Sequence, residues 1–214
     1  GVPPEKLGEF VRAKRPQHLP VVLTPTEVGA VLARMTGMTR LMASVLYGSG
    51  LRLMECCRLR VKDVDLERRE IVVRCGKGQK DRRTMLPERL LGLVRQYLIE
   101  VREQHEHDLT YGAGAVELPD ALDRKFPGAS QDWIWQWVFP ATRPCVDPAT
   151  GRRVLHHVHE TAVQKAVQAA ALAAKLDRRA SCHTLRHGSP RTSSKRGPTS
   201  ARSRRCSVTR TCAP

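Results

Sequence analysis

The chain has no Cys-x-x-Cys motif and no long apolar run, and these absences exclude several classes of protein. Its seven cysteines are scattered without any Cys-x-x-Cys pair, which argues against a zinc ribbon and against a disulfide framework. We expect reduced, mostly buried thiols in a cytoplasmic protein. The longest apolar stretches are far too short to span a membrane, and no signal peptide is recognisable, so we expect no membrane partner.

Acidic residues are scarce relative to basic ones. The 214 residues include 37 Lys and Arg against 21 Asp and Glu, which gives a formal net charge of +16. Residues 188–214 contain seven basic residues and no acid. This balance favours an anionic polymer such as nucleic acid as the partner, although many basic proteins bind none. The length and the 41% of hydrophobic residues suffice for one sizeable core.

Periodicity and capping signals predict a mainly helical chain with a small antiparallel sheet. Thr24 and Glu27 have the spacing of a capping box at a helix start, and Ser181 is a candidate cap for a helix that begins near His183. The other predicted helices cover residues 40–47, 52–59, 88–107, 119–125 and 160–175. The predicted strands cover residues 71–74, 83–87 and an aromatic segment 133–139, with hairpin turns at 76–81 and 147–151. Residues 1–20, with four prolines, are interpreted as a linker, and residues 188–214 as a disordered basic tail.

Basic side chains suited to one phosphodiester recur in three segments: Arg52, Lys77 between two glycines, and His183 with Arg186 in one helix. Arginine donates bidentately and keeps its charge, whereas lysine and histidine can move protons. Each segment also has a plainer interpretation: a surface arginine, an ordinary turn, or a His183/His187 pair with metal-type spacing. That pair has no glutamate between its members and no evident third ligand, so we expect no metal site. The phosphodiester interpretation therefore depends on the presence of all three segments in this order along the chain.

The ordered set resembles the tyrosine recombinase family over about residues 10–187. Gly-Leu-Arg52-Leu-Met-Glu55 is similar to the family's first arginine motif, Gly-Lys77-Gly-Gln-Lys-Asp to its hairpin lysine motif, and His183-Thr-Leu-Arg186 to its His-x-x-Arg box. The resemblance implies an α+β fold, a mainly helical catalytic domain at 21–187 with a small antiparallel sheet, truncated at both ends. Residues 1–20 would then connect to a missing N-terminal DNA-binding domain.

The same resemblance implies the chemistry of the site. Arg52 and Arg186 would clamp the scissile phosphate, Lys77 would act as general acid, and His183 would assist proton transfer, without metal or nucleotide cofactor. The partners would be double-stranded DNA sites. Members of the family assemble as tetramers, and we do not expect this chain to do so.

An unusual insert at about residues 108–155, followed by His156-His157, resembles the segment that distinguishes integron integrases, whose substrate includes folded single-stranded DNA hairpins with protruding bases. By this resemblance Trp135, Pro148, His156 and His157 would bind DNA, since an aromatic or proline face can stack on an extruded base. The alternative is that Trp133, Trp135 and Trp137 simply pack one face of a strand. We expect a mixture of the two.

The nucleophile of the family, a tyrosine beyond the His-x-x-Arg box, has no counterpart, because all three tyrosines precede His183. Tyr47 is expected in the core. Residues 189–214 can be back-translated with GC-rich codons and the resulting nucleotides read in a frame shifted by two. The shifted frame encodes a sequence with helical periodicity that contains Leu-Gly-His, as the family has at this place. We therefore hypothesise a one-nucleotide deletion near the codon of Gly188, which gene sequencing tests. The chain is then predicted to be an integron integrase unable to cleave DNA. The alternative is a non-catalytic protein that binds DNA hairpins.

Overall fold

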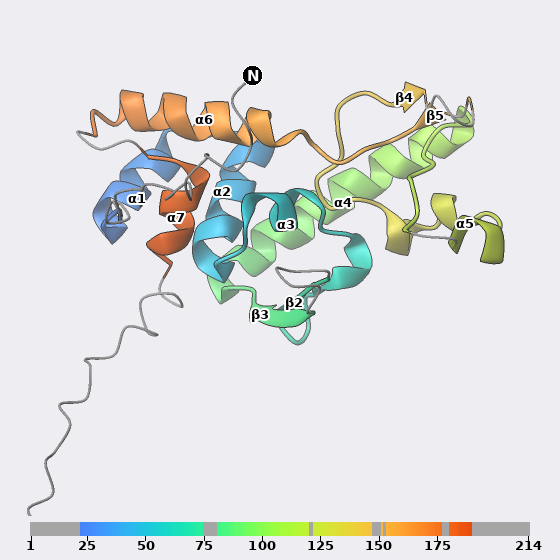
Figure 1. The fold of residues 1–214 in the computed structure, drawn as a ribbon, viewed down its shortest axis with the longest axis horizontal. Coiled ribbons are helices and arrows are strands. Elements are labelled where there is room, and N and C mark those ends of the chain that lie inside the picture. The colour runs from blue at the N-terminus through green and yellow to red at the C-terminus, as the bar shows by residue number, and fades with distance from the viewer. Residues whose placement is uncertain are drawn as a thin grey trace, which may run out of the picture.

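The computed structural model describes residues 22–74, 81–119, 122–146, 151, 153–176 and 180–189. A helical part contains α1, α2, α3, α6 and α7, and the long helix α4 runs from it toward the insert (Figure 1). The helices are α1 Pro25–Ala33, α2 Gly37–Ser49, α3 Leu53–Cys57, α4 Glu88–Thr110, α5 Leu122–Lys125, α6 Glu160–Ala173 and α7 Cys182–His187, with 3-10 turns η2 Val61–Asp63, η3 Ala129–Gln131 and η4 Trp133–Trp135. The strands are β1 Val64–Asp65, β2 Glu70–Val73, β3 Arg82–Met85, β4 Cys145–Val146 and β5 Arg153–Val154. No helix among the described residues is both long enough and apolar enough to cross a bilayer.

Local signals account for most of these helices. The capping box at α1 is confirmed, because the Glu27 amide donates to Thr24 Oγ1 (3.2 Å) and the Thr24 amide donates to Glu27 Oε2 (2.7 Å). The sequence predicted that Gly48-Ser-Gly50 breaks the second helix after Tyr47, and α2 does end within this segment, although it runs through Gly48. An added Cβ at Gly48 would lie 2.5 Å from Pro87 Cγ. The glycine therefore allows close packing inside the helix, and the helix ends only at Gly50, with φ +65°.

The predicted hairpin is confirmed as an antiparallel sheet in the order β1-β2-β3. Ile71 pairs with Thr84, and Val73 pairs with Arg82. The hairpin turn, which includes Lys77, lies outside the described residues. Arg82, the first residue of β3, donates to Glu55 of α3, so this end of β3 lies beside α3.

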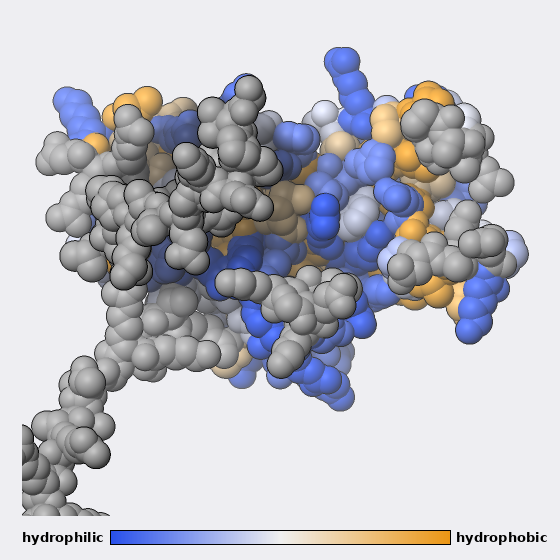
Figure 2. Space-filling model, in the orientation of Figure 1, coloured by the Kyte–Doolittle hydropathy of each residue, from blue (hydrophilic) through white to orange (hydrophobic). Residues whose placement is uncertain are grey.

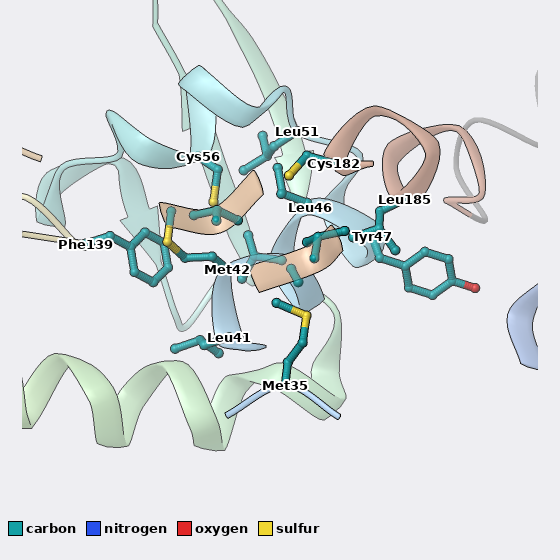
Figure 3. Close-up of a cluster of buried hydrophobic side chains, with 14 of the residues drawn as sticks. Met35, Leu41, Met42, Leu46, Tyr47, Leu51, Cys56, Phe139, Cys182 and Leu185 are labelled. Atoms are coloured by element: carbon teal, nitrogen blue, oxygen red, sulfur yellow. The ribbon is translucent and has the colours of Figure 1, made fainter. Parts of the chain in front are cut away.

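One hydrophobic core joins the helical part to the sheet. Figure 3 shows Met42, Leu46 and Leu51 at its centre, with Phe139 entering from the insert side and Leu185 from α7. Tyr47, 7% exposed, belongs to this core, as predicted. Of the four described cysteines, all free, only Cys145 is exposed, which confirms the expectation of mostly buried thiols in this part of the chain.

The insert has a second, smaller core of Val116, Leu118, Ala129 and Trp137. The predicted aromatic strand 133–139 is wrong: Trp133–Trp135 forms a 3-10 turn, and residues 136–139 are all buried instead of alternating. The cause is the Gln136 side-chain amide, which donates to the carbonyls of Gly114, Ser130 and Asp132 and folds the loop around itself. The strands β4 and β5 pair on either side of the predicted turn, whose residues 147–150 lie outside the described part.

The insert also exposes apolar surface. Tyr111, Phe126, Ile134 and Val146 are each more than half exposed. In the space-filling view, orange patches stand out on the right-hand side, where Figure 1 places the insert (Figure 2).

Candidate active site

Arg52, His183 and Arg186 line one pocket of about 620 Å³ between α3, α6 and α7. The structure thus brings together three of the four residues predicted to bind a phosphodiester. The fourth, Lys77, lies outside the described residues. The polar side chains of Glu160, Gln164, Gln168 and Ser181 complete the lining, together with Leu51, Leu53, Met54 and Cys182.

Arg52 is held at the pocket by the turn that joins α2 to α3. Gly50 ends α2 in the left-handed conformation, and Leu51 beside it is fully buried. Arg52 then takes an extended conformation at the N-cap of α3, so that its backbone amide donates to Glu55 Oε2 at 2.7 Å. Its guanidinium donates to Glu55 Oε1 at 2.7 Å, with 42% of the side chain exposed toward solvent.

Glu55 organises the arginines of the site, and the sequence interpretation did not assign it a role. Its carboxylate accepts two bonds from Arg82 of β3, at 2.9 Å and 2.7 Å, besides those from Arg52. Burial alone would raise the pKa of Glu55, but the bonds from Arg82 and Arg52 outweigh it and lower the pKa to about 2. The Arg-x-x-Glu spacing could have indicated Glu55. Nothing local in the sequence indicated Arg82.

Arg186 adds a third guanidinium to this cluster. Burial lowers its pKa, the positive charges of Arg52 and Arg82 lower it further, and Glu55 acts in the opposite sense. Three guanidinium groups therefore act on the Glu55 carboxylate, and Glu160 adds a second carboxylate at the pocket wall. The arginines still outnumber the carboxylates, and this excess of positive charge suits a bound anion.

The two histidines of α7 contact each other. His183 Nε2 lies 2.8 Å from His187 Nε2, so one ring donates and the other accepts, and the rings meet edge to face. His187 can therefore fix the orientation of His183 at the pocket. Among the described residues no three side chains of the metal-binding types cluster together.

The short helix α7 depends on its cap, which gives a first prediction. Ser181 Oγ accepts from the Thr184 amide at 3.2 Å, as the sequence predicted. Replacing Ser181 with alanine should lower the free energy of unfolding by about 1 kcal/mol, because the first turn of α7 loses its acceptor. Chemical denaturation measures this. Lys165→Ala, an exposed change in the middle of α6, is the control, and an equal loss in both variants would contradict the special dependence of α7 on its cap.

None of the described residues predicted to contact DNA hairpins lines this pocket. The ring of Trp135 is partly buried, with Lys62 Nζ 3.0 Å from its centroid. His156, 45% exposed, lies with its Nδ1 4.0 Å from Glu117 Oε2, and His157 packs edge-on against the indole ring of Trp137. Pro148 lies outside the described residues.

Comparison with known proteins agrees with the resemblance seen in the motifs. The sequence model of the phage integrase family matches residues 22–193. The chain belongs to this family of tyrosine recombinases. An integrase/recombinase of Escherichia coli is 43% identical over 181 residues, which are 85% of this chain and 54% of that protein. The chain thus spans about half the length of the curated relatives it matches.

Solved structures agree on the fold. The crystal structure of XerA recombinase matches 82% of this chain and 50% of its own length, with 25% identity and a TM-score of 0.51. The XerH site-specific recombinase bound to palindromic difH substrate matches 80% of this chain and 41% of its own, with 22% identity and a TM-score of 0.51. The predicted α+β fold of a tyrosine recombinase catalytic domain is thereby confirmed.

Proposed function

We propose that residues 21–187 form the catalytic domain of a site-specific DNA recombinase of the integron integrase type. In this proposal Arg52 and Arg186 clamp the scissile phosphate, Lys77 protonates the leaving oxygen, and His183 assists proton transfer. The observation that supports it best is the convergence of Arg52, His183 and Arg186 on one pocket. Fixed guanidinium donors stabilise the charge that develops on the non-bridging oxygens, which is the main requirement of transesterification at phosphorus.

The proposal extends to the substrate. Trp135, His156 and His157 would receive the protruding bases of a folded hairpin, because all three are at least partly exposed on the insert. Stacking on such side chains tolerates many base sequences. The net positive charge would supply a strong, salt-dependent attraction for the DNA backbone.

We further propose that the 214-residue polypeptide binds DNA without cleaving it. Its tyrosines are Tyr47, Tyr97 and Tyr111, and none of them lines the pocket. Tyr47 is buried, whereas Tyr97 packs against Phe139 and burial, with a smaller effect of Glu100, raises its pKa to about 12. Tyr111 is exposed at the far end of α4. This distribution also favours the second candidate function, a non-catalytic protein that binds DNA hairpins.

Two assays on the same polypeptide test the proposal. In a gel shift, we expect a hairpin with protruding bases to bind about ten-fold more tightly than a fully paired duplex of equal length, since stacking of each base contributes about 1–3 kcal/mol. With a suicide substrate, we expect no covalent protein–DNA adduct. Equal affinity for the two DNAs would contradict the integron-type assignment, and an adduct would contradict the lack of cleavage.

A further inference from the structure

Arg60 is a buried cation between the catalytic part and the insert, and only 9% of its surface is exposed. Its Nη1 donates to the carbonyl of Trp135 at 2.6 Å, and its Nη2 donates to the carbonyl of Glu117 at 2.7 Å. The guanidinium carbon lies 3.8 Å from the ring centroid of Trp137. One side chain therefore fixes two loops and one aromatic ring of the insert.

The contacts of Arg60 reach each described residue proposed to bind a hairpin. Trp135 is held through its carbonyl, and its ring lies 5.6 Å from the guanidinium. His157 packs against the same Trp137 ring that Arg60 covers. His156 lies next to the carboxylate of Glu117, whose carbonyl Arg60 holds.

Arg60 also lies in the short segment that connects the insert to the phosphate pocket. Its backbone bridges Trp137, and the flanking bonds join Val61 to Gln136 (3.0 Å) and Val138 to Leu59 (2.8 Å). The same segment follows directly on α3, whose N-cap residue is Arg52. We propose that Arg60 is a positioning residue that orders the hairpin-recognition residues and fixes them relative to the phosphate pocket, an inference that rests on the proposed function.

The residue type fits this role. A planar guanidinium can donate to two separate carbonyls while it stacks on an indole, which an ammonium cannot do. Burial lowers the pKa of Arg60, whereas Asp63 and Glu117 raise it. Because so little of the side chain reaches solvent, Arg60 acts on DNA through its neighbours and not by binding a phosphate.

The test compares Arg60→Met with Arg58→Met in the full chain. Arg58 is exposed two residues earlier, so its replacement removes the same charge without the buried contacts. For Arg60→Met we expect the preference for a bulged hairpin over a paired duplex to fall about ten-fold, with an unchanged salt dependence of binding. Acrylamide should also quench the tryptophan fluorescence more strongly. Replacement of an exposed arginine that binds phosphate would instead weaken the binding of both DNAs equally, and it would lower the salt slope of binding by about 1.

The two readouts distinguish a failure of the proposed function from a failure of the positioning role of Arg60. If the wild type shows no hairpin preference while Arg60→Met still exposes the tryptophans, the proposed function fails and the positioning of the insert by Arg60 stands. If Arg60→Met keeps both the hairpin preference and the wild-type quenching, Arg60 is not a positioning residue. Should Arg60→Met fail to fold, Arg60→Lys, which keeps the charge but loses the fork, provides the same comparison, and full wild-type behaviour of that variant would overturn the inference.

Discussion

Replacing Glu55 with glutamine should lower the free energy of unfolding by about 2 kcal/mol at pH 7, since bonds to a charged group each contribute about 1.5–3 kcal/mol. The glutamine leaves Arg52 and Arg82 next to Arg186 without the carboxylate that neutralises them. Repulsion among the three guanidinium groups should also widen the pocket and weaken DNA binding. Urea denaturation and a gel shift measure the two effects.

The stabilising effect of Glu55 should depend on pH. The pKa of Glu55 is about 2 in the folded protein against an ordinary 4.5, so its stabilising effect is complete above pH 4.5 and is lost as the pH falls through about 2. The difference in stability between wild type and Glu55→Gln should therefore shrink as the pH falls below 4.5. Glu88→Gln is the control, because the Arg69–Glu88 pair is exposed on both sides and should contribute less than about 1 kcal/mol. A difference that stayed constant from pH 7 to pH 3 would contradict the assigned role of Glu55.

The sequence predicted those features that depend on residues close together in the chain. The caps at Thr24 and Ser181 and the β2-β3 hairpin follow from neighbours a few positions apart, and each is present in the structure. The motif residues Arg52, His183 and Arg186 line one pocket, although a turn and a short helix far apart in the chain supply them.

Features that depend on distant contacts were not predicted. The length of α2 depends on the space that Gly48 leaves for Pro87. The alternation of tryptophans at 133, 135 and 137 has the period of a strand, yet the buried amide of Gln136 determines the loop. Arg82 joins the site only because the sheet places β3 against α3, so no local pattern could have identified it.

Replacing Leu185 with alanine should destabilise the protein by about 3 kcal/mol, in the range of buried leucine truncations. Leu185 is fully buried, and Figure 3 shows it beside Leu46 and Tyr47 of α2. Helix α7 has only six residues, too few to be stable without packing, so this side chain holds the helix in place. Loss of that anchor should displace His183 and Arg186 together from the pocket.

The measurement separates loss of α7 from general unfolding. The amides of Leu185 and Gly188 donate to the carbonyls of Ser181 and Thr184, and their hydrogen exchange reports on α7 alone. In Leu185→Ala these amides should exchange much faster under native conditions. The amides of α2 should exchange faster only by the amount that the lower global stability explains. Leu172→Ala, at a leucine that is 79% exposed, is the matched control and should stay within about 0.5 kcal/mol of the wild type. Since both residues of α7 that we propose to bind the phosphate, His183 and Arg186, depend on one buried contact, Leu185→Ala should also weaken DNA binding more than the loss of either side chain alone. Wild-type affinity in this variant would show that α7 does not hold the phosphate.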